Sequence, residues 1–314
     1  HANIKELHAH PGLLRTPGCE SAWRNVQWEI LDACAALCGV EERLSDWRGV
    51  KLSQSAQVIL TGLVIVADWI ASNPDLFPYF PDGQGASDKE RVEAAWRGLA
   101  LPKPWRPADP VRDTEQLFFS RFELPAGARL RPVQERAVEL ARRMSSPGLM
   151  LIEAPMGEGK TEAALAVAEV FAARSGAGGV FVALPTMATG NAMFPRMLQW
   201  LRRLPDVAGG GSQSVMLAHS KAALNEDFGE LVRAGRRTVA GVEHDGRGDE
   251  WRPRSDRRAS SAELVAHQWL HGRKKAMLSS FVVGTVDQLL FMGLKSRHLA
   301  LRHLALAGKV VIID

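Results

Sequence analysis

Residues 154–161 read Ala-Pro-Met-Gly-Glu-Gly-Lys-Thr, which are the residue types and the spacing of a loop that binds phosphate groups. The two glycines let the backbone approach an anion, Lys160 can reach β- and γ-phosphate oxygens, and the Thr161 hydroxyl can ligate Mg²⁺. A glycine-containing turn before an alanine-rich helix is the alternative. We predict that Lys160 is catalytic and that ATP contacts Pro155, Met156, Gly157, Glu158, Gly159, Lys160, Thr161 and Glu162.

Two predicted elements would position this loop. The apolar run 149–152 predicts a strand before it, and the alanine-rich run 163–166 predicts a helix after it. The positive dipole end of that helix would point at the phosphates. After Leu130, short apolar runs alternate with helical stretches, which is typical of a parallel sheet flanked by helices. The expected strands are residues 149–152, 179–184, 214–217, 281–283 and 310–313.

Three more motifs follow predicted strands, at the edge where open α/β sheets bind ligands. Thr186 ends the run Val-Ala-Leu-Pro-Thr, and Thr285 lies in Val-Gly-Thr-Val-Asp-Gln. Asp314 ends the apolar run Val-Val-Ile-Ile-Asp, where a carboxylate can hold Mg²⁺ through a water. We therefore predict that Asp314 is catalytic and, together with Thr161, a metal ligand. Each motif is weak alone, and their order along the chain is the informative feature.

The loop has alanine at its first position, and the form A-x-x-G-x-G-K-T resembles motif I of superfamily 2 helicases. That resemblance implies further roles. Such helicases use a glutamine upstream of the lysine to hydrogen-bond the adenine edge, which here is Gln134. It also implies that Thr186 and Thr285 hold phosphates of a single nucleic-acid strand.

Together, the phosphate loop, Leu-Pro-Thr-Met-Ala-Thr, Gly-Thr-Val-Asp-Gln and Val-Val-Ile-Ile-Asp resemble the CRISPR-associated helicase-nucleases of type I systems. The resemblance implies an α + α/β fold, in which an all-helical HD-type nuclease domain precedes a RecA-like helicase domain with a parallel sheet. It implies residues 1–101 as the C-terminal part of the nuclease domain, 102–129 as a linker and 130–314 as an incomplete first RecA-like domain. ATP and Mg²⁺ would serve the helicase, and Fe, Co, Ni or Mn the nuclease.

Residues 63–73 resemble the closing segment of that nuclease, whose aspartate is a metal ligand; here it is Asp68. Asp68 also interrupts the most apolar predicted helix, and a carboxylate near an apolar face is costly unless it is paired, protonated or bound to metal. The alternative is an aspartate that faces solvent or caps a neighbouring helix. The resemblance implies His10 as a second ligand. The family has His-His-Gly where this chain has His-Pro-Gly, so His8 and His1 remain open as replacements or as surface histidines.

Composition fits a globular protein, with 46% hydrophobic and 24% charged residues and a formal net charge of +4. Its 314 residues suggest two domains. The most apolar stretch, 58–67, is about half of the ~20 residues that cross a bilayer, so we expect no membrane segment. Cys34 and Cys38 lie one helical turn apart and Cys19 stands alone, so we expect reduced, buried cysteines and neither a disulfide framework nor a zinc site.

Apolar spacing predicts helices over 23–38 and 53–71. The proline-rich run 102–110 predicts a linker, because it suits neither a regular helix nor a central strand. The stretch 229–260 is dense in arginine and glycine. It predicts a long surface insertion, with a nucleic-acid contact as the alternative.

The function expected from the resemblance is an ATP-dependent single-stranded DNA translocase, coupled to a metal-dependent nuclease that degrades foreign DNA in CRISPR interference. Its implied partners are the non-target strand of an R-loop and a Cascade-like RNA-guided surveillance complex with its large subunit, in the cytoplasm. His1 is not an initiator methionine and Asp314 falls within a strand motif, so we expect a catalytically incomplete portion in which ATP still binds. An ATP-dependent RNA helicase or remodeller with a non-catalytic helical N-terminal domain remains open, as does a nucleotide-binding regulatory module.

Overall fold

The described part of the computed structural model comprises residues 20–47, 49–78, 87–108, 112–125, 127–144, 148–205, 213–218, 222, 225–232, 264–265, 270, 275–294 and 298–314. These residues fall into two compact units, one that ends at Gln54 and one that begins at Ser55. The predicted insertion at 229–260 lies almost wholly outside the described residues.

The first unit consists of α2 (Glu20–Cys38), the 3₁₀ helix η2 (Glu41–Arg43) and α3 (Leu44–Trp47). Helix α2 confirms the helix predicted over 23–38. Large apolar side chains of α2 are exposed, namely Trp23, Val26, Trp28, Ile30, Leu31 and Leu37. Cys34 and Cys38 are free but exposed, so the prediction that they are buried is wrong. A helical spacing puts both on one face, but no described element of this unit covers that face.

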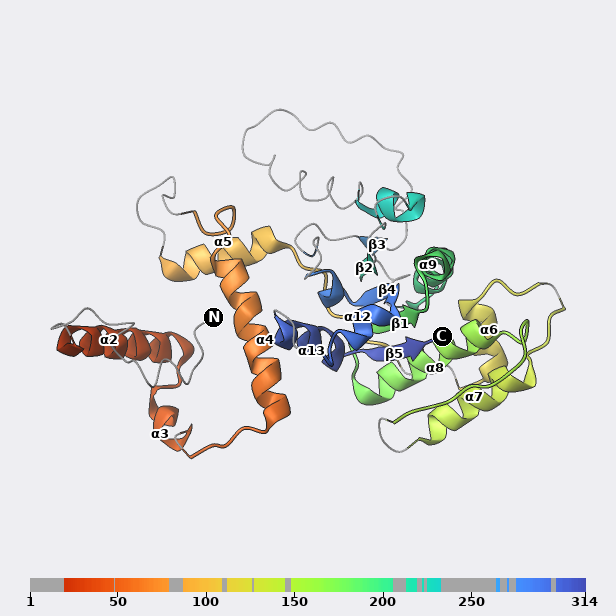
Figure 1. Ribbon diagram of the computed structural model, residues 1–314, viewed down its shortest axis with the longest axis horizontal. Helices are drawn as coiled ribbons and strands as arrows, with labels where there is room; N and C mark the ends of the chain where they lie inside the picture. The colour runs from red at the N-terminus through yellow and green to blue at the C-terminus, as the bar shows by residue number, and fades with distance from the viewer. Residues whose placement is uncertain are drawn as a thin grey trace, which may run out of the picture. The chain divides into compact units, whose positions relative to one another are not determined.

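The second unit combines helices with a parallel sheet (Figure 1). Its helices are α4 (Gln54–Ala71), α5 (Asp88–Leu99), α6 (Thr114–Arg121), α7 (Pro132–Arg143), α8 (Lys160–Ser175), α9 (Met187–Arg202), η5 (Ala276–Leu278), α12 (Val286–Leu290) and α13 (Leu299–Ala307). Its strands are β1 (Val180–Leu184), β2 (Gln213–Ala218), β3 (Leu264–Val265), β4 (Phe281–Thr285) and β5 (Val310–Ile313).

The strands form one sheet in the order β3-β2-β4-β1-β5, and every pairing is parallel. In the central register, Val182 lies opposite Val283 on one side and Ile312 on the other. All five residues of β1 are buried, as expected for a strand whose sheet is covered by helices on both faces. Strands β1, β2, β4 and β5 confirm four of the five predicted strands.

The fifth predicted strand, residues 149–152, is not a strand in the structure. Met150 and Ile152 pack against buried residues of α7 and α8, whereas Leu149 is 94% exposed and Leu151 87% exposed. The run has the alternation of a strand, but no described strand pairs with it. Because a strand is defined by hydrogen bonds to a neighbour, an apolar run alone does not make one.

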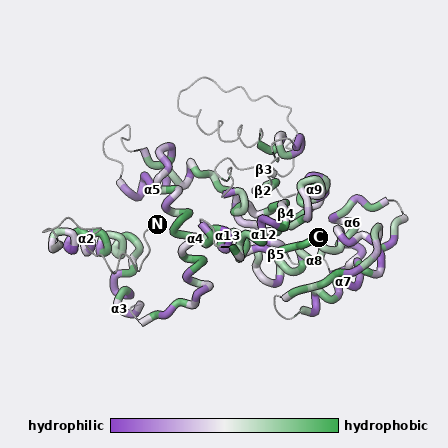
Figure 2. Tube along the Cα trace, viewed as in Figure 1, coloured by the Kyte–Doolittle hydropathy of each residue, from purple (hydrophilic) through white to green (hydrophobic). Residues whose placement is uncertain are grey.

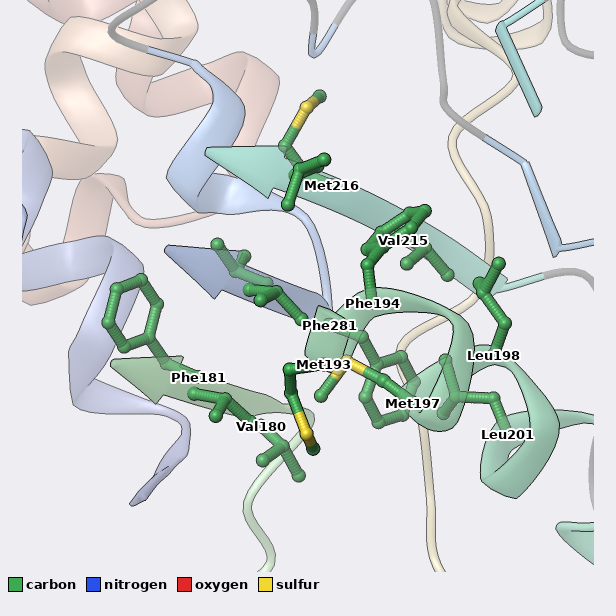
Figure 3. Packing of buried hydrophobic residues seen from close by; sticks show 14 of the residues in the cluster. Val180, Phe181, Met193, Phe194, Met197, Leu198, Leu201, Val215, Met216 and Phe281 are labelled. Atoms are coloured by element: carbon green, nitrogen blue, oxygen red, sulfur yellow. The ribbon is translucent and has the colours of Figure 1, made fainter. Parts of the chain in front are cut away.

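Helix α9 covers one face of the sheet with an apolar stripe. Figure 3 shows Met193, Phe194, Met197, Leu198 and Leu201 of this helix beside β1, β2 and β4. The N-terminal end of α9 is fixed locally. The Thr186 hydroxyl accepts the backbone N–H of Thr189 at 3.2 Å, and the Thr189 hydroxyl accepts that of Thr186 at 3.2 Å, which is a reciprocal cap.

The segment predicted as a linker, 102–129, contributes to the core. Trp105 is buried, with its ring 6.2 Å from that of Trp200 and 5.1 Å from that of Phe281. Helix α6 also lies within this segment, and its N-cap Asp113 accepts the backbone N–H of Gln116 at 2.8 Å. These contacts attach the segment to the sheet-containing part, and the boundary between domains stays a prediction.

Helix α8 packs between the sheet and helices α6 and α7. On its buried side, Glu169 forms an ion pair with Arg121 of α6 at 2.8 Å, through more than one hydrogen bond. Both side chains are almost fully buried. Since α8 carries Lys160 and Thr161 in its first turn, this ion pair ties the helix of the phosphate loop to its neighbour.

Helix α4 confirms the helix predicted over 53–71, and it is apolar along much of its length (Figure 2). Gly62 is its buried residue and packs against Ala300 of α13, while Leu63 and Val64 are exposed. Among the described residues, α4 is the one helix long and apolar enough to cross a membrane. A single helix of this kind is weak evidence for a membrane segment.

Candidate functional site

The phosphate loop leads directly into α8, and its glycines adopt left-handed backbone conformations. Gly157 has φ +84° and Gly159 has φ +73°. A Cβ atom at Gly159 would also lie 2.1 Å from Nε2 of Gln134. The conformation therefore favours glycine at position 159, and a larger residue would also displace the Gln134 side chain.

Gln134 lies behind this glycine, and its side-chain amide holds the loop. It is buried; its Oε1 accepts the backbone N–H of Arg131 at 3.0 Å, and its Nε2 donates to the carbonyl of Gly159 at 3.4 Å. The structure thus places Gln134 against Gly159 of the phosphate loop. The adenine contact itself stays a prediction.

Lys160 and Thr161 are the first two residues of α8. The Lys160 ammonium donates to the carbonyl oxygens of Ala154 and Pro155, the latter at 2.9 Å. The lysine therefore lies over the loop where phosphate oxygens would be. The Thr161 hydroxyl accepts a hydrogen bond from Arg196 at 3.3 Å, and the carboxylate of Glu162 forms an ion pair with the same arginine.

Asp314 follows β5, and its backbone N–H donates to the carbonyl of Ala183 at 3.1 Å. Lys160, Thr161 and Asp314 all line one cavity of about 760 Å³, within the range of small-molecule sites. The rest of its lining is largely aliphatic, so these three residues are the part of the lining suited to phosphate and a divalent cation. The structure therefore places Asp314 in the same cavity as Lys160 and Thr161, which lie far from it in the sequence.

Lys309 lines the same cavity, just before β5. Its ammonium donates to the carbonyl oxygens of Met277, at 2.9 Å, and Ala305. Burial disfavours the charged form and lowers the pKa of Lys309 to about 8. Two carbonyl acceptors and no described carboxylate partner hold this cation, which lies at the opposite end of β5 from Asp314.

Thr186 and Thr285 end up at one edge of the sheet. Thr186 follows β1, and Thr285 is the last residue of the neighbouring strand β4, where it pairs with Leu184 of β1. Thr186 is exposed, and Thr285 is half-buried at the start of α12. Asp314 follows β5 at the same edge, so the residues predicted to contact a strand and those predicted to contact a nucleotide share it.

The predicted nuclease metal site is not assembled by the described residues. Asp68 lies in α4 and is exposed. Within the described ranges, no group of three histidine, cysteine, aspartate or glutamate side chains could hold a metal ion. The argument that an apolar face makes Asp68 costly does not apply to an exposed carboxylate. His10 lies outside the described residues, as do His1 and His8, so both ligand assignments stay predictions.

Arg196 is the site residue that the sequence did not reveal. It lies in the middle of α9, half-exposed, and reaches residues 34 and 35 positions away. No motif surrounds it, and arginine on the polar side of an amphipathic helix is ordinary. A contact between two helices leaves no local signal in the sequence.

Comparisons with known proteins relate this chain to one family. Residues 2–77 match the family model described as Cas3, HD domain. The CRISPR-associated nuclease/helicase Cas3 of Streptococcus thermophilus is 39% identical over 268 residues, which are 84% of this chain and 26% of that protein. The CRISPR-associated endonuclease/helicase Cas3 of Thermus thermophilus is 33% identical over 316 residues, 100% of this chain and 31% of that protein. The chain thus spans about a quarter to a third of these relatives.

Solved structures give the same result. The crystal structure of T. fusca Cas3-AMPPNP matches with a TM-score of 0.58 and 32% identity, over 84% of this chain and 26% of that one. That of T. fusca Cas3-ATP matches with a TM-score of 0.59 and 31% identity, over 84% and 27%. These matches confirm the coarse prediction of helices combined with a parallel sheet.

Proposed function

We infer the function from the premise that this chain belongs to the Cas3 family of CRISPR-associated proteins. We propose that it forms the ATP-binding and strand-binding edge of an ATP-dependent single-stranded DNA translocase. Its N-terminal part would belong to a metal-dependent HD nuclease, with Asp68 and His10 as ligands. The whole protein would degrade foreign DNA in CRISPR interference.

One observation carries this proposal: Lys160, Thr161 and Asp314 line the same cavity. The three are a cation for phosphate and two oxygen ligands for a hard divalent cation. Thr186 and Thr285 follow strands of the same sheet edge. The match to T. fusca Cas3-AMPPNP supports a nucleotide at this edge.

The residues present fit Mg²⁺-ATP. Lys160 would exchange its bonds to the carbonyls of Ala154 and Pro155 for bonds to phosphate oxygens. Thr161 and Asp314 would hold Mg²⁺, which neutralises charge that develops on the transferred phosphoryl group. Gln134 would keep the loop in shape through Gly159. The described residues assemble no nuclease metal site, so we derive no step there.

The proposed substrate is single-stranded DNA, the non-target strand of an R-loop opened by a Cascade-like surveillance complex. Thr186 and Thr285 offer hydroxyl groups rather than charges, so they suit backbone phosphates, which carry no sequence information. The cytoplasm is the proposed location, because that is where such a surveillance complex would work.

A reciprocal pair of variants in the intact protein tests the proposal. Lys160→Ala should lower ATP hydrolysis by about 100-fold or more, because an electrostatic contact to the reacting phosphate is lost. Metal-dependent nicking of DNA that is already single-stranded should survive. Asp68→Ala should remove nicking and lower metal content, with DNA-stimulated ATP hydrolysis retained. Wild-type ATP hydrolysis in Lys160→Ala would contradict the nucleotide site, and undiminished nicking in Asp68→Ala the metal ligand.

The same assays separate the two alternatives. An RNA helicase or remodeller would hydrolyse ATP in response to RNA and would not cut single-stranded DNA with any metal. A regulatory module would bind nucleotide without turnover that DNA stimulates. Stimulation by single-stranded DNA together with metal-dependent nicking would exclude both.

A further inference from the structure

Arg196 joins two parts of the site that the sequence leaves separate. It lies on α9, the helix whose first turn is capped by Thr186. Its guanidinium donates to the Thr161 hydroxyl at 3.3 Å and forms an ion pair with Glu162. The strand-contacting end of α9 is therefore linked through one side chain to the first turn of α8.

The chemistry at Thr161 makes this link sensitive to nucleotide. In the structure, a permanent cation with five donors and no acceptor occupies one side of the hydroxyl oxygen proposed to ligate Mg²⁺. A divalent cation on the same oxygen would repel the guanidinium. Arg196 would then lose its hydrogen bond to Thr161 and either move away or keep only its ion pair with Glu162. Either change alters how α9 is held against α8, because Arg196 belongs to α9.

Stability alone does not account for this link, because both of its side chains are partly exposed. The Arg196 side chain is 47% exposed and that of Glu162 is 24% exposed. Ion pairs in such positions contribute little to stability. By contrast, the pair between Arg121 and Glu169 fastens α8 from its buried side. Removing the Arg196 side chain should therefore leave the fold intact and change how strongly the nucleotide site and the strand-contacting end of α9 affect each other.

We propose that Arg196 is a positioning residue that couples the nucleotide site to strand binding, by holding Thr161 and Glu162 against α9. This rests on the proposed function of the two sites. Coupling means that single-stranded DNA changes the affinity for nucleotide, and that nucleotide changes the affinity for DNA by the same factor. Arg196 would carry much of that factor without contacting either reacting atom.

The test measures equilibrium binding of a fluorescent ATP analogue to the intact protein, with Mg²⁺, in the presence and absence of a single-stranded oligonucleotide. The variants are Arg196→Ala, Arg196→Lys and Arg202→Ala, the last removing an exposed arginine from the same helix. In wild-type protein, DNA should change nucleotide affinity about fivefold or more. In Arg196→Ala the factor should fall close to one, with an unchanged melting temperature.

Arg196→Lys should recover part of the factor, because lysine keeps the charge but loses the planar fork. Arg202→Ala should resemble wild type. Glu162→Gln combined with Arg196→Ala should lose no more coupling than Arg196→Ala alone, since both changes break one contact. Wild-type coupling in Arg196→Ala, or equal losses in Arg196→Ala and Arg202→Ala, would overturn this inference and leave the proposed function standing. A wild-type protein that binds no nucleotide would instead overturn the proposed function, and this inference with it.

Discussion

Strand β1 buries every one of its side chains, whereas α4 buries Gly62 and exposes Asp68. Both elements carry a residue run that the family resemblance singles out, but only β1 lies between packed layers. Strands paired in register bring Thr186, Thr285 and Asp314 to one edge, with β1 and most of β4 buried and β5 partly exposed. An exposed helix gives Asp68 no described ligand partner. Pairing within the sheet, and not the motif alone, is what brings these residues to one edge.

The largest expected effect is a difference in stability between loss of a buried ion pair and loss of an exposed one. Arg121→Ala would leave the Glu169 carboxylate buried without its partner, at a cost of about 3–5 kcal/mol in the free energy of unfolding. The matched variant is Arg91→Ala on α5, which breaks the exposed pair with Asp88 at 3.8 Å and should cost about 0–1 kcal/mol. Urea unfolding of both variants measures the difference.

Should Arg121→Ala fail to fold, Arg121→Met combined with Glu169→Leu keeps the prediction testable. This pair replaces the buried ions by apolar groups and should recover most of the stability. Equal losses in the free energy of unfolding for Arg121→Ala and Arg91→Ala would contradict this prediction, because burial would then make no difference to the two ion pairs.

The next effect concerns the phosphate loop. Gly159→Ala and Gly157→Ala each place a side chain at positive φ, which costs about 1–2 kcal/mol. In Gly159→Ala, the new Cβ also displaces Gln134, whereas the space at Gly157 is open. The Gly159→Ala variant should therefore bind nucleotide at least about tenfold more weakly than the Gly157→Ala variant. A tenfold difference in affinity corresponds to about 1.4 kcal/mol of binding free energy.

Gln134→Ala added to Gly159→Ala should recover part of the lost affinity, because it removes the collision. Isothermal titration with an ATP analogue measures all three variants. Indistinguishable affinities of the two single variants would mean that Gln134 does not shape the loop.

The third effect is the pH dependence of stability set by Lys309. Its pKa is about 8 in the folded protein against 10.5 for an unperturbed lysine, so the unfolded state binds more protons between these values. Stability should rise as pH increases from about 8 to 10.5, by at most about 3 kcal/mol and less where solvent reaches the side chain. Lys309→Met should remove this contribution.

The control for Lys309→Met is Lys103→Met, because Lys103 is exposed. It should show the wild-type rise in the free energy of unfolding between pH 8 and pH 10. A Lys309→Met variant with the same rise as wild type would contradict the assignment of that rise to the buried ammonium.

Much of the sheet could be predicted because its signals are local. Strands β1, β2, β4 and β5 are apolar runs of the expected length, bounded by polar or turn residues. The two-residue strand β3 is too short to leave a pattern. The run 149–152 has the pattern of a strand, but whether it pairs depends on distant residues.

The residues of the candidate site also fall into those with a local sequence signal and those without one. Lys160 and Thr161 were predictable because a phosphate loop is contiguous, and Asp314 because it follows a strand of the same sheet. Arg196 and Lys309 act through partners about 30 residues away, so no motif marks them. The burial of Cys34 and Cys38 was wrongly predicted because helical spacing gives a face but not what covers it.

The central claim is that one sheet edge holds both the nucleotide and a single DNA strand. It is tested most directly by titrating the intact protein with fluorescent single-stranded oligonucleotides of different sequence, at several salt concentrations, with and without an ATP analogue. Affinity should be independent of base sequence and fall with salt, with a log–log slope of roughly −0.7 per phosphate neutralised. Thr285→Val and Thr186→Val should weaken binding without changing that slope, because a hydroxyl group releases no counterion. Thr186→Ser keeps the hydroxyl that caps α9 and should bind like wild type. Strong sequence preference, affinity that hardly changes with salt, or unaltered binding by both valine variants would contradict the account.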